Sequence, residues 1–96
     1  MFIVLLKFSG NPSQASQHME AHNIWLKRGF DDGVFLLSGG LHSRAGGAVF
    51  AHNISLRDLQ SRVNQDPFVV NKIVNVEIIQ ITPGLADNRL AFLIDN

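Results

Sequence analysis

Apolar residues near the start of the chain follow one another without the spacing of a helix. Residues 2–8 form an apolar run of strand length that is rich in β-forming residues. Apolar side chains occupy both alternating faces of this run, which is typical of a central strand covered on both sides. The run therefore predicts the first strand of a sheet.

Residues 13–30 follow a helical period instead. At about 100° per residue, one stripe of this segment consists of Ala15, Met19, His22, Leu26 and Phe30, with Trp25 at its edge. Gly29 and the turn at residues 31–33 predict the end of the helix. The pattern predicts a helix whose apolar stripe, His22 included, packs on the sheet.

Two further strands are predicted after this helix. Residues 34–37 form a buried strand, and the Ser38-Gly39-Gly40 segment at its end predicts a bulge. A polar connection at residues 42–45 leads to Gly46 and Gly47, which open a third strand at residues 48–52. Two strands with a short loop between them predict a hairpin.

The second half of the chain repeats the order of helix and strand. Ser55 and Asp58 resemble a capping box, and the buried stripe of the helix after them consists of Leu56, Leu59 and Val63. Asp66 and Pro67 suit the N-cap and N1 positions of a short turn that ends near Lys72. Residues 74–82 predict the fourth strand.

The predicted order is β-α-β-β-α-β within one domain, residues 1–96. This order is that of the ferredoxin-like α+β fold, an antiparallel four-stranded sheet with both helices on one face. Strand four also places apolar side chains on the second face, where Ile79 and Ile81 alternate with Val76 and Ile78. A second copy would cover that face, so we expect a homodimer, a dimeric α+β barrel.

Composition removes several classes of function. The formal net charge is zero and only 17% of the residues are charged, so no basic stripe predicts nucleic-acid binding. No apolar run reaches the ~18 residues of a membrane span, and no signal peptide is predicted. The chain has no cysteine, which excludes disulfides and thiolate chemistry and fits a cytoplasmic protein.

Two residues stand out chemically. His22 lies within an apolar helical stripe, where its imidazole needs a partner; a backbone carbonyl would serve, and so would a carboxylate. Asp66 precedes proline at a predicted helix start, where it caps the helix, and one of its oxygens remains available to a pocket. A carboxylate bonded to one imidazole nitrogen leaves the other nitrogen as a general base near neutral pH.

Four segments resemble the YciI-like (YCII-related) family: the apolar start at residues 2–8, the helical segment 22–26, the strand and glycines at 33–40, and Asp66-Pro67-Phe68-Val69. They occur in the family's order over residues 1 to about 83. The resemblance implies a ferredoxin-like dimer with a pocket at the sheet, a catalytic pair at His22 and Asp66, and lyase-like chemistry on small ring compounds. The chain departs from the family pattern at Gly40, where proline is common, and at residues 19–21, which lack an arginine.

The hypothesis is therefore an enzyme that uses His22 and Asp66 for acid–base proton transfer, without a cofactor, on a small cyclic or anionic molecule. Ser38, Gly39 and Phe68 are candidate substrate-binding residues, and Arg44 is a candidate anion contact across the dimer. No metal site is predicted, because no cysteine or second carboxylate completes a set with His18 and His22.

Two alternatives remain open at this stage. A dimer of this fold also suits a non-catalytic small-molecule-binding or regulatory module, and the fold cannot decide between them. A cofactor-free monooxygenase, or a haem protein with His22 as the axial ligand, is the third hypothesis.

Overall fold

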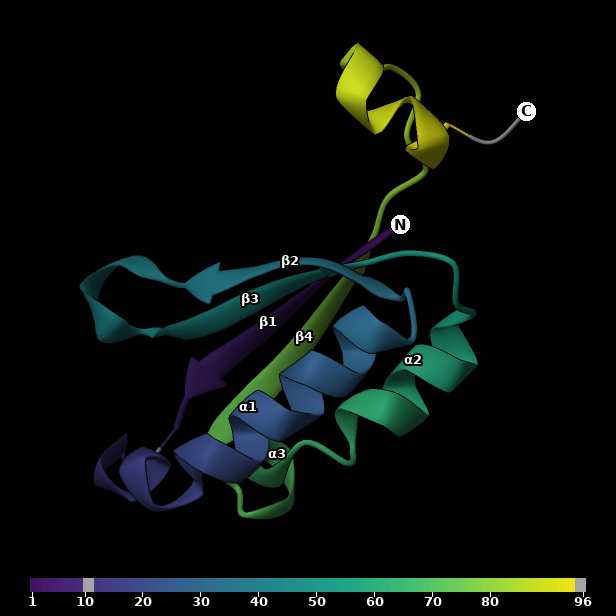
Figure 1. Ribbon diagram of the computed structural model, residues 1–96. Coiled ribbons are helices and arrows are strands. Elements are labelled where there is room, and N and C mark those ends of the chain that lie inside the picture. The colour runs from purple at the N-terminus through teal and green to yellow at the C-terminus, as the bar shows by residue number, and fades with distance from the viewer. Residues whose placement is uncertain (10–11, 95–96) are drawn as a thin grey trace.

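The computed structural model describes residues 1–9 and 12–94 and contains one antiparallel sheet with a layer of helices on one face (Figure 1). The strands lie in the order β2-β3-β1-β4, and they are β1 (Phe2–Phe8), β2 (Phe35–Gly40), β3 (Gly46–Ala51) and β4 (Val74–Gln80). The helices are α1 (Ala15–Asp31), α2 (Leu56–Val63) and α3 (Pro67–Val70), with 3-10 turns at Pro12–Gln14, His42–Arg44 and Asn88–Leu93. The ferredoxin-like α+β prediction is confirmed.

The register of the strands separates the two faces of the sheet. Val4 pairs with Val49 on one side and with Ile78 on the other, so all three side chains point toward the helices. Val4 and Val49 are almost completely buried. The core thus lies between the helices and this face of the sheet, with Leu59 and Val63 of α2 closing it from the other layer.

The stripe of α1 that packs on the sheet is rotated from the predicted one. Trp25 and Gly29 are buried, whereas Met19 and Phe30 are 42% and 41% exposed. Gly29 lies inside the helix, which ends at Asp31 and not at the glycine. A β-carbon at this position would overlap the Phe35 ring. The bulky ring of Phe35 therefore requires glycine at this position, and the buried Trp25 ring packs edge-on against it with the centroids 5.2 Å apart.

Strands β2 and β3 also differ from the prediction. Ser38, Gly39 and Gly40 belong to the strand and pair regularly with Val49, Ala48 and Gly47. The irregularity lies earlier, between Phe35 and Leu37. Strand β3 begins at Gly46, and β4 ends at Gln80, two residues before the predicted end.

Both predicted helix caps are confirmed. The Ser55 hydroxyl accepts a hydrogen bond from the Asp58 backbone N–H at 3.1 Å, and Asp66 caps α3, with Pro67 at the first helical position. These caps determine where α2 and α3 begin, and the second of them determines where the Asp66 carboxylate lies.

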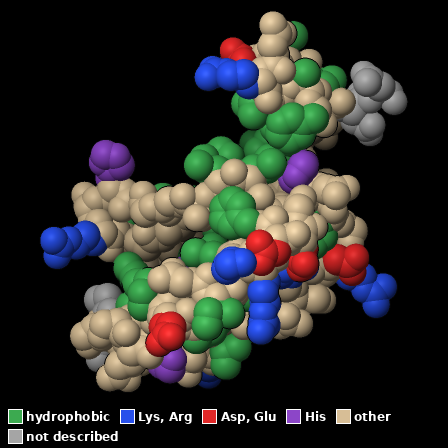
Figure 2. Space-filling view, viewed as in Figure 1, with side chains coloured by type: hydrophobic (Ala, Val, Ile, Leu, Met, Phe, Trp, Pro, Cys, Tyr) green, Lys and Arg blue, Asp and Glu red, His purple; other side chains and the backbone are tan. Residues whose placement is uncertain are grey.

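The segment after β4 leaves the body of the protein and forms the 3-10 turn at Asn88–Leu93 (Figure 1). Leu85 is 98% exposed there, and the Phe92 ring reaches His52 with the two ring centroids 5.5 Å apart. In Figure 2 hydrophobic side chains are visible where this tail leaves the body. Across the described residues, no helix combines the length and apolar character needed to cross a membrane.

Candidate functional site

A hydrogen bond between the first helix and the N-terminus of α3 is the centre of the candidate site. The Nδ1 atom of His22 lies 2.7 Å from Oδ1 of Asp66. The aspartate has no exposed surface, and the histidine side chain is 11% exposed. A neutral imidazole that donates from Nδ1 keeps its lone pair on Nε2, so this contact selects the tautomer that can accept a proton at Nε2.

The capping role of Asp66 explains the position of its carboxylate. Oδ1 also accepts a hydrogen bond from the Phe68 backbone N–H at 3.1 Å, so a single oxygen both caps α3 and binds His22. The other oxygen, Oδ2, is buried without a hydrogen-bond partner among the described residues. Burying a carboxylate oxygen without a partner costs stability, so this arrangement is not explained by stability alone.

Two aromatic rings stack against the imidazole of His22. The Phe68 ring lies parallel to it, with centroids 4.0 Å apart, and the Trp25 ring stacks less closely at 5.8 Å. Trp25 is held in turn by a 2.9 Å hydrogen bond from its indole N–H to the Arg62 backbone carbonyl. The side chain of His22 is therefore oriented by α2 and α3 as well as by its own helix.

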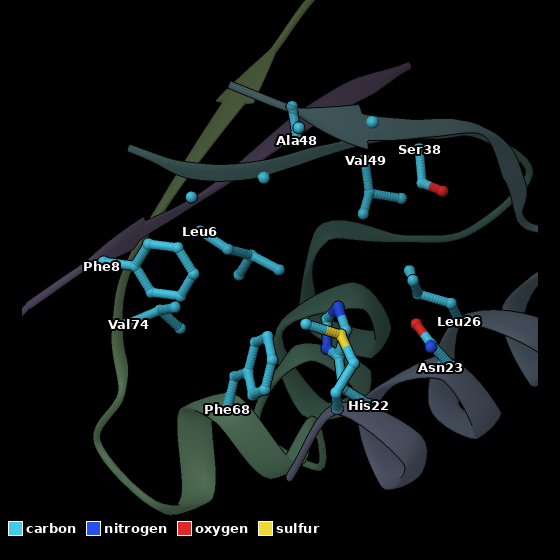
Figure 3. Close-up of a pocket in the computed structure, with 15 residues that line it drawn as sticks. Leu6, Phe8, His22, Asn23, Leu26, Ser38, Ala48, Val49, Phe68 and Val74 are labelled. Atoms are coloured by element: carbon cyan, nitrogen blue, oxygen red, sulfur yellow. The ribbon is translucent and has the colours of Figure 1, made fainter. Parts of the chain in front are cut away.

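A cavity of about 270 Å³ opens beside this pair, between α1 and the helix-facing side of the sheet. Figure 3 shows His22 and Phe68 side by side at its lower wall, with Ser38 and Val49 above. Its lining is mostly apolar, as in small-molecule sites generally, and consists of Leu6, Phe8, Met19, His22, Asn23, Leu26, Ser38, Gly39, Gly40, Gly46, Gly47, Ala48, Val49, Phe68 and Val74.

None of these lining residues is Lys, Arg, Asp or Glu. The polar side chains among them are His22, Asn23 and Ser38, and within the described part of the chain the Asn23 amide and the Ser38 hydroxyl form no hydrogen bond. Residues 1–9 and 12–94 contain no group of three or more His, Cys, Asp or Glu side chains arranged to hold a metal ion. The cavity thus offers hydrogen bonds and apolar contacts together with one imidazole ring.

Most of the residues predicted from the sequence meet at this cavity. Ser38, Gly39 and Phe68 line it beside His22, with Asp66 directly behind the imidazole. Arg44 lies in the exposed turn between β2 and β3 and does not line the cavity of its own subunit. Asn23 was missed, because a polar residue on a helix gives no sequence signal until its neighbours in space are known.

The fold and the site define a ferredoxin-like α+β domain with a buried His–Asp pair beside an apolar cavity. A similar solved structure is 5-chloro-2-hydroxyhydroquinone dehydrochlorinase (TftG) from Burkholderia phenoliruptrix AC1100, in complex with 2,5-dihydroxybenzoquinone. It aligns with a TM-score of 0.71 and 14% sequence identity, covering 88% of this chain and 96% of that chain. At this identity the likeness shows the fold, which in that protein is the dimeric α+β barrel type.

Comparison by sequence identifies no related protein. No family model matches the chain, and no curated protein matches it by sequence.

Proposed function

We propose that the protein is a small-molecule enzyme of the YciI-like family in which His22 and Asp66 act as a general acid–base pair. The observation that carries the proposal is the 2.7 Å contact between Nδ1 of His22 and Oδ1 of Asp66 at the wall of the cavity. The contact leaves Nε2 without a hydrogen bond to any described residue, and that nitrogen is the one that would meet a substrate.

The reaction begins with removal of a proton from a substrate carbon by Nε2 of His22. The electron pair of the broken C–H bond then forms a carbon–carbon double bond, and a leaving group departs from the neighbouring saturated carbon with the electrons of its own bond. A chlorinated hydroquinone would react through its diketo form, in which the carbon beside a carbonyl group carries the proton and the next carbon carries the chlorine. Asp66 stabilises the imidazolium that forms, and the proton returns from Nε2 to the leaving group or to water. In an isomerisation the same proton returns to a different substrate atom. Acid–base assistance of this kind accelerates a reaction by about 10²–10⁴-fold.

The structural neighbour favours this class of reaction. That enzyme is a dehydrochlorinase, so it removes the elements of hydrogen chloride from its substrate, and its bound compound is a single six-membered ring. The cavity beside His22 has a volume suited to a compound of that size. Proton removal followed by loss of a leaving group needs a general acid–base pair and no nucleophile.

The test follows deuterium uptake and loss of leaving group for a panel of ring compounds in D2O, with 5-chloro-2-hydroxyhydroquinone included. His22→Gln is expected to lower the rate by about 10²–10⁴-fold. His18→Gln is the matched control, because His18 lies one turn earlier on α1 and does not line the cavity. Equal rates for the two variants would contradict the proposal.

A non-catalytic binding module predicts a different result. Such a protein would bind members of the panel, as measured by thermal shift, without incorporating deuterium or releasing chloride. Ligand binding without turnover across the panel would therefore favour the binding module, because a ligand that binds only the folded state raises the melting temperature.

We further propose that two copies associate through the face of the sheet that the helices leave open. By register, Ile3 pairs with Phe50 and with Ile79 on this face, and Leu37, next to Phe50 on β2, is 55% exposed. Ile79 and Ile81 are 38% and 37% exposed. An apolar surface that runs across all strands of a small sheet is typical of a subunit interface.

Sedimentation velocity tests this interface. Leu37→Glu places a charge on the open face and is expected to produce a monomer, whereas Val70→Glu is expected to leave the dimer intact, because Val70 is 62% exposed on α3. A monomeric wild-type protein would contradict the proposed dimer.

A further inference from the structure

Two glycines that face each other across the hairpin leave one wall of the cavity without side chains. Gly40 of β2 pairs with Gly47 of β3, which pairs with Leu6 of β1. Since Leu6 points into the core, Gly40 and Gly47 lie on the same helix-facing side. Gly39, the neighbour of Gly40, lies on the opposite side of the sheet.

The space beside Gly40 is open. A β-carbon at Gly40 would have only the Gly46 carbonyl oxygen near it, at 3.9 Å, and one at Gly39 would have no atom within 4 Å. A β-carbon at Gly47 would lie 3.2 Å from the Gly39 carbonyl oxygen. The backbone therefore tolerates a side chain at Gly40, and its absence enlarges the cavity.

The polar groups around this wall are uncharged. Ser38 extends from β2 toward α1, with Asn23 and Leu26 below it (Figure 3). Neither the Asn23 amide nor the Ser38 hydroxyl has a hydrogen-bond partner within the described residues, so both are free to bind a ligand. Because no Lys or Arg lines the cavity among residues 1–9 and 12–94, a carboxylate or phosphate group would lose water without gaining a cationic partner there.

We propose that the site binds an uncharged single-ring compound with hydroxyl or carbonyl oxygens, and that Gly40 and Gly47 form the wall that accepts the flat ring. Asn23 and Ser38 bind the ring oxygens. The inference rests on the proposed function for the role of His22, but it concerns only which molecules bind.

Three one-ring probes separate charge from size. They are catechol, 3,4-dihydroxybenzamide, and 3,4-dihydroxybenzoate, whose carboxylate has nearly the shape of the amide. Binding is measured with the intact protein at pH 7 by NMR titration of backbone amides. Catechol and the amide are expected to bind at the cavity, and the carboxylate about tenfold more weakly than the amide. Tighter binding of the carboxylate, or no binding of catechol at millimolar concentration, would overturn the ligand class.

Two glycines, one in the wall and one outside the cavity, provide a matched pair of variants. Gly40→Ala adds a methyl group inside the cavity and is expected to weaken 3,4-dihydroxybenzamide binding by about tenfold. Gly84→Ala adds the same group after β4, where the space is open and no cavity-lining residue lies, and is expected to leave the affinity unchanged. Sedimentation velocity on both variants checks that the association state is the same. Equal affinities for the two variants would overturn the role of Gly40.

Asn23→Ala tests the hydrogen bond to the ring oxygens. Loss of one such bond is expected to weaken catechol binding by about fivefold, whereas Asn75→Ala, at an exposed position of β4, is expected to have no effect. The binding results stand apart from catalysis: if catechol binds as described while His22→Gln leaves turnover unchanged, the proposed function fails and the ligand class holds. If His22→Gln lowers turnover but only charged substrates are turned over, the proposed function holds and the ligand class fails.

Discussion

The imidazole of His22 lies nearly parallel to the phenyl ring of Phe68, with the ring centroids 4.0 Å apart and the planes within 6°. The two residues come from α1 and α3, and the backbone N–H of Phe68 binds the same carboxylate oxygen as His22. One residue therefore provides both a flat surface for the imidazole and part of the hydrogen bonding that places its partner. This arrangement restricts rotation of the ring and directs Nε2 toward the cavity.

Phe68→Leu is expected to lower the free energy of unfolding by about 1 kcal/mol, through loss of the stacked ring at nearly constant volume. The ring of His22 should also become more mobile, which NMR relaxation of its side chain would detect. Phe92→Leu is the control, because Phe92 is 58% exposed on the tail. A stable variant with an immobile His22 ring would show that Phe68 does not orient the imidazole.

Asp66→Asn separates charge from geometry. The amide oxygen can occupy the place of Oδ1, keeping the bonds from His22 and from the Phe68 backbone N–H, but the negative charge that stabilises the imidazolium is lost. We expect turnover to fall by about 10²–10⁴-fold while α3 stays formed. Asp66→Ala removes the cap as well and is expected to cost about 0.5–2 kcal/mol of stability for that reason alone.

Urea denaturation and turnover are measured together on both Asp66 variants. The ¹⁵N chemical shifts of the His22 ring report whether the proton stays on Nδ1 in the asparagine variant. Full activity of Asp66→Asn would mean that the carboxylate only caps α3.

Gly46→Ala is expected to be strongly destabilising. Gly46 has a φ of +136°, a region that L side chains rarely adopt, and a β-carbon there would overlap the Leu6 carbonyl oxygen. We expect a loss of more than about 1 kcal/mol in the free energy of unfolding, measured by urea denaturation. Gly84→Ala, which has open space around it, is the control, and equal stability of the two variants would contradict this interpretation.

The stability of the 3-10 turn at Asn88–Leu93 is expected to depend on pH. A hydrogen bond from the Arg89 backbone N–H, together with one from its guanidinium, holds the pKa of the Asp87 carboxyl below its ordinary value. Because the pKa is lower in the folded turn, the stabilising effect of the cap is present above the unfolded pKa. It is lost as pH falls through the folded pKa.

The Arg89 amide proton shift, followed by NMR from pH 7 down to pH 2, should report this loss. In Asp87→Asn, which caps without titrating, the shift should stay constant over the same range. A wild-type amide shift that does not change with pH would show that the carboxylate does not hold the turn.

The sequence alone predicted the order of the elements and where α2 and α3 begin. Local physics decides these features: the apolar run of residues 2–8 suits a buried strand, and Asp66 before Pro67 supplies a side-chain acceptor and a suitable backbone angle at a helix start. The helical period also placed His22 on the buried face of α1. These predictions needed only the spacing of residues within one segment.

The tertiary structure decided which side chains meet. Periodicity predicted a stripe through Met19 and Phe30, but the fit between Phe35 and Gly29 rotates α1 so that Trp25 is buried instead. The 2.7 Å contact between His22 and Asp66 spans 44 positions of sequence, and Gly40 and Gly47 form a wall only because β2 and β3 pair in one register. Spacing within a segment determines the direction of each side chain, whereas contacts between segments depend on how the layers pack.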